Sequence, residues 1–341
     1  MHRSKPDFIR LSLMTIPIVA TALLLNAFAA SAQETKSATL GTSSVGSTYY
    51  TLSVAMGNIM SKNTGVNVSV VAVGGADATL RAIGDKKSDL GMVHTWALYK
   101  AFAGAAPFDR KLNVRSLLTG QATGNCLIAR ADRGIKSPAD LAGKTIVGER
   151  PALKSVDEYT YALLDLYGIK GKVRIISTAE SREAMQALQQ GTVDAVVLPC
   201  GLRAPHIMEL MQSVASVTVD IPDDKMKELL AKTTPGAVTA TNPPNTYKGQ
   251  VKPYTIPVYQ TVLVSSAEFS EDAAYKITKA IVENQQALVA AHPTGRAWTL
   301  ENTLRVTSFA VPFHPGAVKY FKESGAWKDA HEETQKRLLS K

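Results

Sequence analysis

The sequence predicts an α/β protein built as two lobes that face each other across a cleft. The first observation is an alternation of strand and helix patterns from residue 39 to residue 213, which is typical of parallel sheets covered by helices. The second is that the strand–helix–strand order occurs twice, over residues 39–93 and again over residues 135–198. Ligands of such sheets collect at the carboxyl ends of the strands, so a binding site is expected between the lobes.

The first 32 residues are expected to be a secretory signal that precedes the fold. Basic residues begin the segment, Leu11–Phe28 is mostly apolar, and Ala30-Ser31-Ala32 has the small-residue pattern of a cleavage site. Cleavage is expected after Ala32, which would place the mature protein in the periplasm. An uncleaved membrane anchor is the alternative, because the apolar run approaches the length of a bilayer span. Pro17 and the cleavage pattern favour removal.

Short apolar runs between turn residues predict the strands, and apolar residues at helical spacing predict the helices. The expected strands are Thr39–Gly41, Val66–Val73, Leu90–Val93, Leu127–Arg130, Thr145–Gly148, Val173–Ser177 and Ala195–Leu198. The expected helices are Tyr49–Ser61, Ala76–Lys86, Thr95–Phe102, Pro138–Leu141, Ser155–Tyr167, Ser181–Gln190 and Arg203–Ser213.

Both repeats close with a similar phrase, KSDLGMV at residues 87–93 and GTVDAVV at residues 191–197. In each phrase a helix ends in a small polar turn, and an aspartate precedes a buried strand. We therefore expect lobe II to span residues 126–214 and lobe I to combine residues 33–125 with residues 215–341.

The chain after the second repeat is less regular. Six prolines between residues 217 and 264 predict a segment that is mostly loop, with one helix near Asp223–Lys232. A helical tail follows over Ser270–Ala291, where Ser270 is a good N-cap and apolar residues recur at helical spacing.

The turn from Gly41 to Thr48 connects a short strand to an amphipathic helix and is rich in Gly, Ser and Thr. Backbone N–H groups are free at the start of such a helix and lie at the positive end of its dipole, so they can receive a carboxylate or phosphate. A nucleotide is excluded, because a phosphate loop needs Lys directly after its second glycine and Ser47 follows Gly46 here.

Composition excludes several other functions. The net charge is +9, but Lys and Arg are scattered without basic runs or interleaved aromatics, which favours a solvated basic surface or an attraction for anionic solutes over nucleic-acid binding. The six histidines lack metal-ligand spacing and no nucleophile elbow is present, so no metal, cofactor or catalysis is expected. Cys126 and Cys200 are expected to be free, partly buried thiols, with a disulfide as the alternative that an oxidising compartment permits.

Polar and small residues at the expected strand-to-helix junctions are the candidate ligand-binding residues. Each alone has a structural explanation, and their joint placement is what indicates a site. Backbone around Gly46–Thr48 would bind a carboxylate, Gly75 would allow close backbone approach, Tyr49 or Trp96 would shield an apolar part, and Arg150 or Ser155 would be added on closure. The full set is Thr42, Ser43, Gly46, Ser47, Thr48, Tyr49, Gly75, Asp77, Thr95, Trp96, Gln121, Arg150 and Ser155.

Several of these phrases together resemble the TAXI family, the solute receptors of tripartite ATP-independent periplasmic (TRAP) transporters. The matching pieces are Gly41-Thr42 with Gly46-Ser47-Thr48-Tyr49-Tyr50, Val73-Gly74-Gly75-Ala76, Ser88-Asp89-Leu90-Gly91-Met92-Val93, Asp140-Leu141-Ala142-Gly143-Lys144, Gly191-Thr192-Val193-Asp194-Ala195 and Pro312-Phe313-His314-Pro315-Gly316-Ala317.

The resemblance implies a type II periplasmic binding protein fold, whose lobes are joined by crossing strands and whose C-terminal helices return to lobe I. It also implies a small organic anion or amino acid as ligand, dicarboxylate-like or glutamate-like, and a TRAP membrane permease as partner. The chain departs from the family pattern at Gly148–Ser155, at His94-Thr95-Trp96 and at Pro199-Cys200-Gly201, which are the places where a different ligand would be selected.

Two other functions stay open at this point. A binding protein of the same fold could serve a tricarboxylate-type transporter or a sensor kinase. An enzyme of the two-lobe class would need a nucleophile or metal cluster in the cleft, and the sequence shows none.

Overall fold

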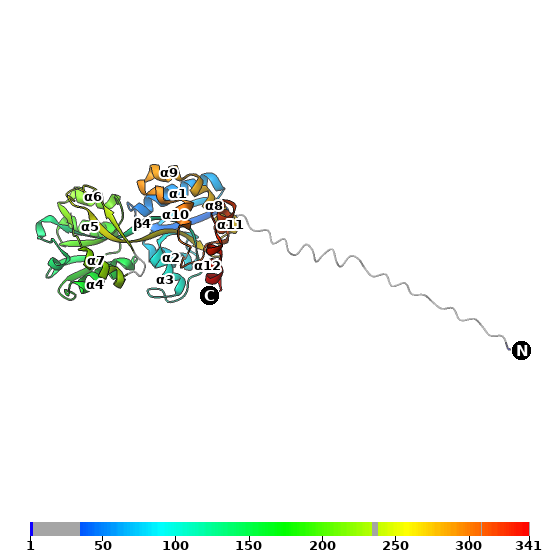
Figure 1. Ribbon diagram of the computed structural model, residues 1–341, viewed down its shortest axis with the longest axis horizontal. Coiled ribbons are helices and arrows are strands. Elements are labelled where there is room, and N and C mark those ends of the chain that lie inside the picture. Colours follow the sequence, from blue (N-terminus) through cyan, green and yellow to red (C-terminus); the bar gives the residue numbers. More distant parts are fainter. Residues whose placement is uncertain (3–34, 234–237, 308, 341) are drawn as a thin grey trace. The chain divides into compact units, whose positions relative to one another are not determined.

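The computed structural model describes residues 1–2, 35–233, 238–307 and 309–340. Residues 1–34 and 35–341 form separate units, and the fold is that of the second unit (Figure 1). The expected signal segment and its cleavage site lie outside the described residues. Among the described residues, every helix is too short or too polar to span a bilayer.

Strands and helices alternate as far as residue 213, and helices predominate after the last strand. The strands are β1 (Ser37–Ser43), β2 (Asn67–Gly74), β3 (Leu90–His94), β4 (Val114–Arg130), β5 (Thr145–Glu149), β6 (Arg174–Ser177), β7 (Ala195–Cys200), β8 (Ser216–Thr218), β9 (Val238–Asn242) and β10 (Tyr254–Ser266). The helices are α1 (Thr48–Thr64), α2 (Ala76–Gly84), α3 (Thr95–Ala103), α4 (Lys154–Leu166), α5 (Ser181–Gln190), α6 (Pro205–Ser213), α7 (Asp223–Thr233), α8 (Glu271–Glu283), α9 (Gln285–Ala291), α10 (Leu300–Leu304), α11 (Pro315–Glu323) and α12 (Asp329–Leu339).

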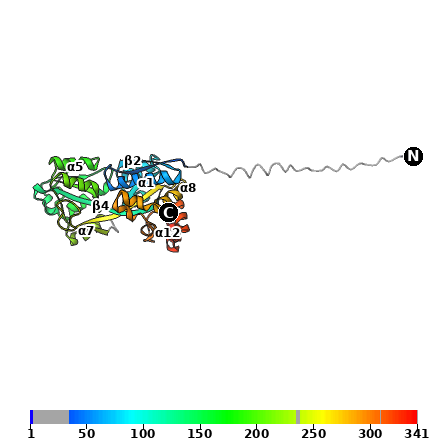
Figure 2. The ribbon, with the colours of Figure 1, turned by 90° about the horizontal axis from the view of Figure 1, so that it is seen from above.

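The main path of the sheet runs in the order β2-β1-β3-β10-β4-β7-β5-β6. It divides into two equivalent halves, because the three outer strands of each half are parallel and each half ends on a long antiparallel strand. Those long strands, β10 and β4, pair with each other in the middle. Figures 1 and 2 show β4 passing from the lobe that carries α1 to the lobe that carries α5. The fold is the expected two-lobe α/β architecture.

The two aspartates of the repeated phrases make the same contacts in both halves. The carboxylate of Asp89 accepts the Thr39 N–H at 2.8 Å, and that of Asp194 accepts the Thr145 N–H at 2.8 Å. Each aspartate N–H also donates back to the carbonyl of the same threonine. Each aspartate carbonyl accepts an N–H from the crossing strand of its half, from Ser266 and Arg130 respectively. The repeated phrase in the sequence therefore corresponds to a repeated set of hydrogen bonds, which fixes neighbouring strands to each other in both halves of the sheet.

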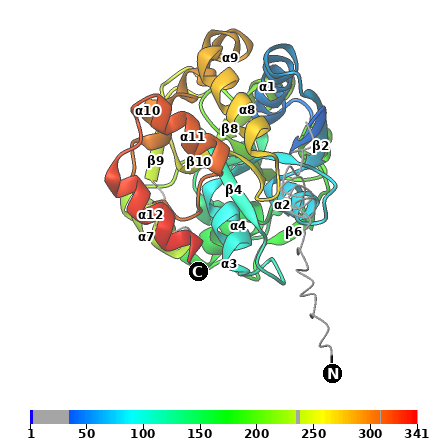
Figure 3. The same cartoon turned by 90° about the vertical axis from the view of Figure 1, so that its right-hand side faces the viewer.

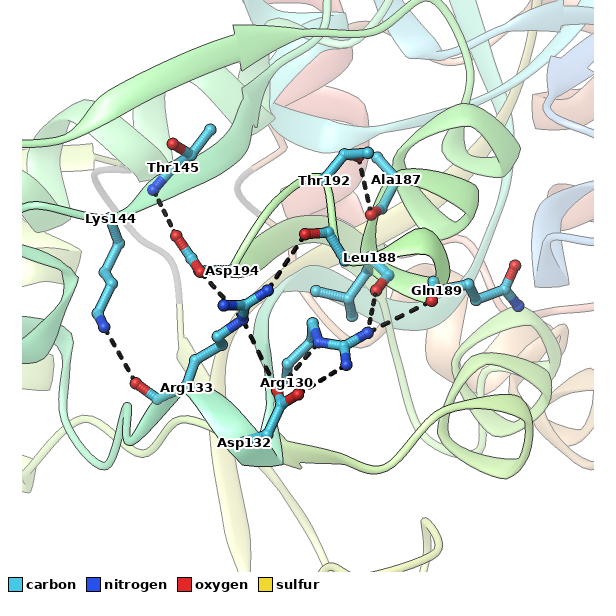
Figure 4. A network of polar contacts seen from close by, with 11 residues as sticks. Arg130, Asp132, Arg133, Lys144, Thr145, Ala187, Leu188, Gln189, Thr192 and Asp194 are labelled. Carbon is cyan, nitrogen blue, oxygen red and sulfur yellow. Dashed lines mark hydrogen bonds and ion pairs between the residues drawn. The ribbon is translucent and has the colours of Figure 1, made fainter.

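In the second half this anchor is extended by two arginines (Figure 4). The guanidinium of Arg133 lies 3.2 Å from Asp194, and that of Arg130 pairs with Asp132 at 2.7 Å. Arg130 also donates to the Leu188 carbonyl at the end of α5, where a cation complements the helix dipole. These contacts hold α5 and the start of β7 against the crossing strand.

The C-terminal helices return to the first lobe, as expected. Figure 3 shows α8 and α9 beside α1, and α11 beside α8. These helices share a core that contains Leu52, Met56, Ile277 and Phe321. Ser270 caps α8 by accepting the Ala273 N–H. β8 pairs with the end of β4, and α7 packs on α4, so these two elements lie beside second-lobe elements. The expected division of the chain into lobes stays a prediction.

The crossing strands differ most from the expected elements. The sequence predicted only Leu127–Arg130 where β4 has 17 residues, because the earlier part contains two glycines and polar residues. The glycines are required by close packing: a Cβ at Gly120 would lie 2.1 Å from the Trp298 ring, and one at Gly124 would lie 1.9 Å from the Pro257 carbonyl oxygen. The prediction of a mostly loop segment was also wrong, since β10 lies in it. Its Pro257 is tolerated because β10 pairs with β4 only from Val258 onward.

Cys126 and Cys200 form a disulfide, so the expectation of free thiols was wrong. The two residues lie on the neighbouring antiparallel strands β4 and β7, and their Cα atoms are 5.8 Å apart, which is ordinary disulfide spacing. The bridge joins strands of the same half of the sheet and therefore leaves the opposite lobe free.

We predict that the Cys126→Ser/Cys200→Ser double variant is less stable than the wild type by about 2–4 kcal/mol, because the bridge closes a long loop in the unfolded chain. Urea unfolding of both proteins without reductant measures the difference. Reductant should bring the wild type to the stability of the variant, and titratable thiols in the unreduced, denatured wild type would contradict the assignment.

Candidate functional site

A cavity lies between the lobes, at the carboxyl ends of β1, β3 and β7 and beside the crossing strands. Its empty volume is about 580 Å³ when the open solvent at the mouth is included. Six of the sequence-predicted residues line it: Ser43, Ser47, Thr48, Tyr49, Gln121 and Ser155. The other lining residues are Ala76, His94, Ala122, Thr123, Gly124, Leu153, Pro199, Cys200, Gly201, Leu202, Ala204, His206, Tyr259 and Thr294.

Five helices begin at this cavity, namely α1, α2, α3, α4 and α6. Each contributes its cap or a first-turn residue to the lining. The start of a helix carries a partial positive charge, so five starts give the cavity a positive potential. None of the described lining residues is Asp, Glu, Lys or Arg. The described lining therefore offers an anion helix starts and neutral polar groups instead of a charged side chain.

The start of α1 has the geometry that the sequence predicted for an anion cradle. Ser47 is the N-cap, and its hydroxyl accepts the Tyr50 N–H at 3.1 Å while donating to the Ser44 carbonyl at 2.7 Å. The N–H groups of Thr48 and Tyr49 lie in the first turn, where no intrahelical acceptor exists. They lie in the cavity wall and can donate to a ligand anion.

His94, which the sequence analysis left out of the candidate set, presents a fixed donor to the cavity. Its Nδ1 accepts the Ala97 N–H at 3.2 Å as the N-cap of α3, so the proton of the neutral ring is on Nε2. Nε2 is buried without a protein partner. Burial lowers the pKa of His94 to about 3, which keeps the ring neutral at pH 7. Tyr259 packs on this ring with centroids 4.2 Å apart.

Gln121 presents a second fixed donor. Its Oε1 accepts the Trp298 indole N–H at 2.8 Å, which sets the orientation of the amide. The amide nitrogen Nε2 is buried without a protein partner. Because the indole can only donate, the amide oxygen faces Trp298, and the nitrogen of this lining residue is left without a protein partner.

His206 presents a fixed acceptor from the opposite lobe. Its Nε2 lies 2.7 Å from the Pro199 carbonyl oxygen, which can only accept, so Nε2 carries the proton. Nδ1 is buried without a protein partner. Burial lowers the pKa of His206 to about 4 despite the opposing hydrogen bond to Pro199, so Nδ1 is an acceptor at pH 7.

Arg150 joins the two lobes instead of lining the cavity, and it is not the surface residue that was its alternative. Its side chain is only 3% exposed. It donates to the Gly74 carbonyl at 2.5 Å and to the Ser44 hydroxyl on the first lobe, and to the Ser181 hydroxyl on its own lobe. Glu180 pairs with it at 3.1 Å. Burial lowers the pKa of Arg150.

Asp77 and Trp96 also cross between the lobes. The Asp77 carboxylate accepts the Lys154 N–H at 2.7 Å and so caps α4 from the opposite lobe, where Leu153 supplies no side-chain cap. The Trp96 indole donates to Glu158 of α4 at 3.1 Å. The lobes are therefore closed on each other in this structure.

The remaining predicted residues lie away from the cavity wall. Thr42 is buried and accepts a hydrogen bond from Ser53, and Thr95 is exposed on α3. Gly46 has a φ of +85° and forms the turn before α1. Gly75 does allow a close backbone approach, but to protein, since a Cβ there would lie 2.4 Å from the Ala152 carbonyl oxygen.

The residues that sequence reasoning missed come mainly from the second lobe and the crossing strands. His94 had a usable signal, because it directly follows a predicted strand and precedes a predicted helix. Tyr259 had none, because its segment was predicted to be mostly loop. For residues 199–204 and His206, the strand end was predicted but the direction of the side chains depends on closure.

Comparison with known proteins decides the family. The family model described as NMT1-like matches residues 40–325. The chain belongs to the NMT1-like family. Its two-lobed mixed sheet with two crossing strands is the type II periplasmic binding protein fold, as predicted.

Solved structures that are similar to this NMT1-like chain have low sequence identity to it. A protein from Bordetella bronchiseptica RB50 is 15% identical, with 85% of this chain and 98% of that chain covered and a TM-score of 0.54. An ancestral arginine-binding protein bound to arginine is 15% identical, with coverage of 76% and 95% and a TM-score of 0.46. The alkanesulfonate-binding protein from Xanthomonas axonopodis pv. citri, bound to MOPS, is 14% identical, with coverage of 89% and 84% and a TM-score of 0.46.

We predict that Asp77→Asn alters the pH dependence of stability of this NMT1-like protein. Burial raises the pKa of Asp77 from 3.8 to about 6, against the opposing Lys154 hydrogen bond. The Asp77 carboxyl therefore stays protonated to a higher pH in the folded state than in the unfolded state. The stability that it contributes is fully present below about pH 4 and is lost as the pH rises to about 6. Asn keeps an acceptor oxygen but has no ionisable group. The free energy of unfolding of the variant should therefore rise by about 2–3 kcal/mol relative to that of the wild type between about pH 4 and about pH 6.

Urea unfolding at steps between pH 4 and pH 7 measures this difference. Asp165→Asn, an exposed position on α4, is the control and should leave the pH profile unchanged. If the difference in free energy of unfolding between Asp77→Asn and the wild type were the same at every pH, the pKa of Asp77 would not change on folding.

We predict that Arg150→Met opens the lobes, because it removes the donors to Gly74 and Ser44 and leaves their acceptors without a partner. Small-angle X-ray scattering of the ligand-free proteins should show a larger radius of gyration for the variant. Arg174→Met, at an exposed position of β6, is the control. Identical radii for Arg150→Met and the wild type would show that this contact does not hold the lobes together.

Proposed function

We propose that the protein is a solute-binding receptor that captures a small organic anion or amino acid in the cavity between its lobes. The observation that carries this proposal is the convergence of five helix starts on a cavity that is lined by buried, unpartnered polar atoms. Backbone N–H groups at helix starts bind an anion and leave it chemically unchanged. His94, Gln121 and His206 are held in fixed orientations by protein partners, which supports a binding role.

Capture would begin at the start of α1, where a ligand carboxylate accepts the Thr48 and Tyr49 N–H groups. Rotation about β4 and β10 would then bring the second lobe over the ligand, and the contacts of Arg150 and Asp77 would hold it there. A ligand that touches both lobes shifts the equilibrium toward the closed state by its extra contacts in that state.

We propose further that the receptor works in the periplasm and delivers its ligand to a TRAP permease. The support is the resemblance of Gly46-Ser47-Thr48-Tyr49 and the other phrases to TAXI receptors, which also implies dicarboxylates and glutamate as ligands to be tested. A permease could distinguish the loaded receptor by the closed arrangement of its lobes.

We expect calorimetric screening of small organic acids and amino acids at pH 7 to identify at least one micromolar ligand. Ser47→Ala should weaken that ligand only modestly, by less than about tenfold, because backbone N–H groups make the main contact. The variant should also lose about 1 kcal/mol of stability through its lost cap.

Ser270→Ala is the matched control, since Ser270 caps α8 in the same way outside the cavity. It should lower stability by a similar amount and leave affinity unchanged. Failure of every acid and amino acid to bind, or turnover of a bound solute, would exclude the proposed receptor function.

A further inference from the structure

The charges around the cavity limit the charge of the ligand. The described lining carries no acidic or basic side chain, and five helix starts contribute positive potential there. A single carboxylate is accommodated at the start of α1. A second carboxylate would lose its hydration without gaining a cation, and an ammonium group would face helix starts without an acidic partner.

Arg150 does not alter this balance. Its guanidinium is turned to Ser44, Gly74, Ser181 and Glu180, and it is absent from the lining. Using it for a second carboxylate would break the contacts that join the lobes. Arg150 is therefore already engaged with protein groups of both lobes.

The three fixed side chains limit the hydrogen bonding of the ligand. His94 Nε2–H and the Gln121 amide can only donate into the cavity, because their other polar atoms are held by Ala97 and Trp298. His206 Nδ1 can only accept, because its Nε2–H is held by Pro199. A ligand group that satisfies all three must contain both an acceptor and a donor, and leaving any of them unpaired costs affinity.

We propose that the ligand is a monocarboxylate without an ammonium group, and that its other end carries a neutral group which both accepts and donates hydrogen bonds, such as a carboxamide or hydroxyl. The carboxylate binds the start of α1. The neutral group accepts from His94 and Gln121 and donates to His206, so it bridges the lobes. Dicarboxylates and amino acids are rejected. This inference rests on the proposed receptor function and narrows its ligand class.

Three probes that share the four-carbon succinyl chain test the inference by calorimetry at pH 7. Succinamate has one carboxylate and one carboxamide, monomethyl succinate keeps the charge but lacks a donor, and succinate has two carboxylates. We expect succinamate to bind at least about tenfold more tightly than either of the others.

Two variants test whether His206 and Gln121 cause the preference for succinamate. His206→Phe removes the acceptor and should make succinamate and monomethyl succinate bind equally. Gln121→Glu keeps an acceptor for Trp298 but replaces the donor with a charge, and it should weaken both monoanions more than about tenfold. Gln286→Glu adds the same charge at an exposed position on α9 and is the control that should bind as the wild type does.

Each other outcome overturns the ligand class. If succinate binds as tightly as succinamate, or monomethyl succinate matches it in the wild type, the neutral-group argument is wrong while the receptor function stands. If none of the three probes binds, the ligand class is also wrong. The wider acid and amino-acid screen then decides separately whether the protein is a receptor.

Discussion

The antiparallel pairing of β4 with β10 is the interaction on which the rest of the structure depends. It is the seam where the two halves of the sheet meet, and it requires Gly120 and Gly124 on β4 because Trp298 and Pro257 pack directly against their Cα atoms. The same strands supply Gln121 and Tyr259 to the cavity wall. This one pair of strands therefore joins the two halves of the sheet, carries the axis about which the lobes would rotate, and forms part of the cavity wall.

Three polar groups of the cavity lining have their hydrogen-bonding roles fixed by the protein itself. His94, Gln121 and His206 each use one polar atom on a protein partner and leave the other for the ligand. Groups held in this way lose little freedom on binding. The same arrangement removes adaptability, since none of the three can exchange donor for acceptor without breaking its protein bond.

The fold could be predicted from the sequence because its signals are local. The outer strands, the helices α1 to α6 and the aspartates that precede β3 and β7 all follow from patterns within about ten residues. The site could be predicted only in part. Ser47 and Thr48 follow from helix capping, which is local, whereas Arg150 and Asp77 were assigned to a ligand because nothing in their neighbourhoods shows that they contact the opposite lobe. The tautomers of His94 and His206 depend on partners that only the folded chain brings together.

The packing of α1 against α8 has a consequence for how the chain acquires its structure. The core of the first lobe combines Leu52 and Met56 with Ile277 and Phe321, and more than two hundred residues separate the two sets. A chain emerging from its N-terminus cannot complete this core until its last helices have been released, whereas β5, β6 and β7 find their partners within a much shorter span. The part of the α1 surface that packs against α8 and α9 thus stays uncovered for most of synthesis, whereas the contacts of α1 with β1 and β2 can form early.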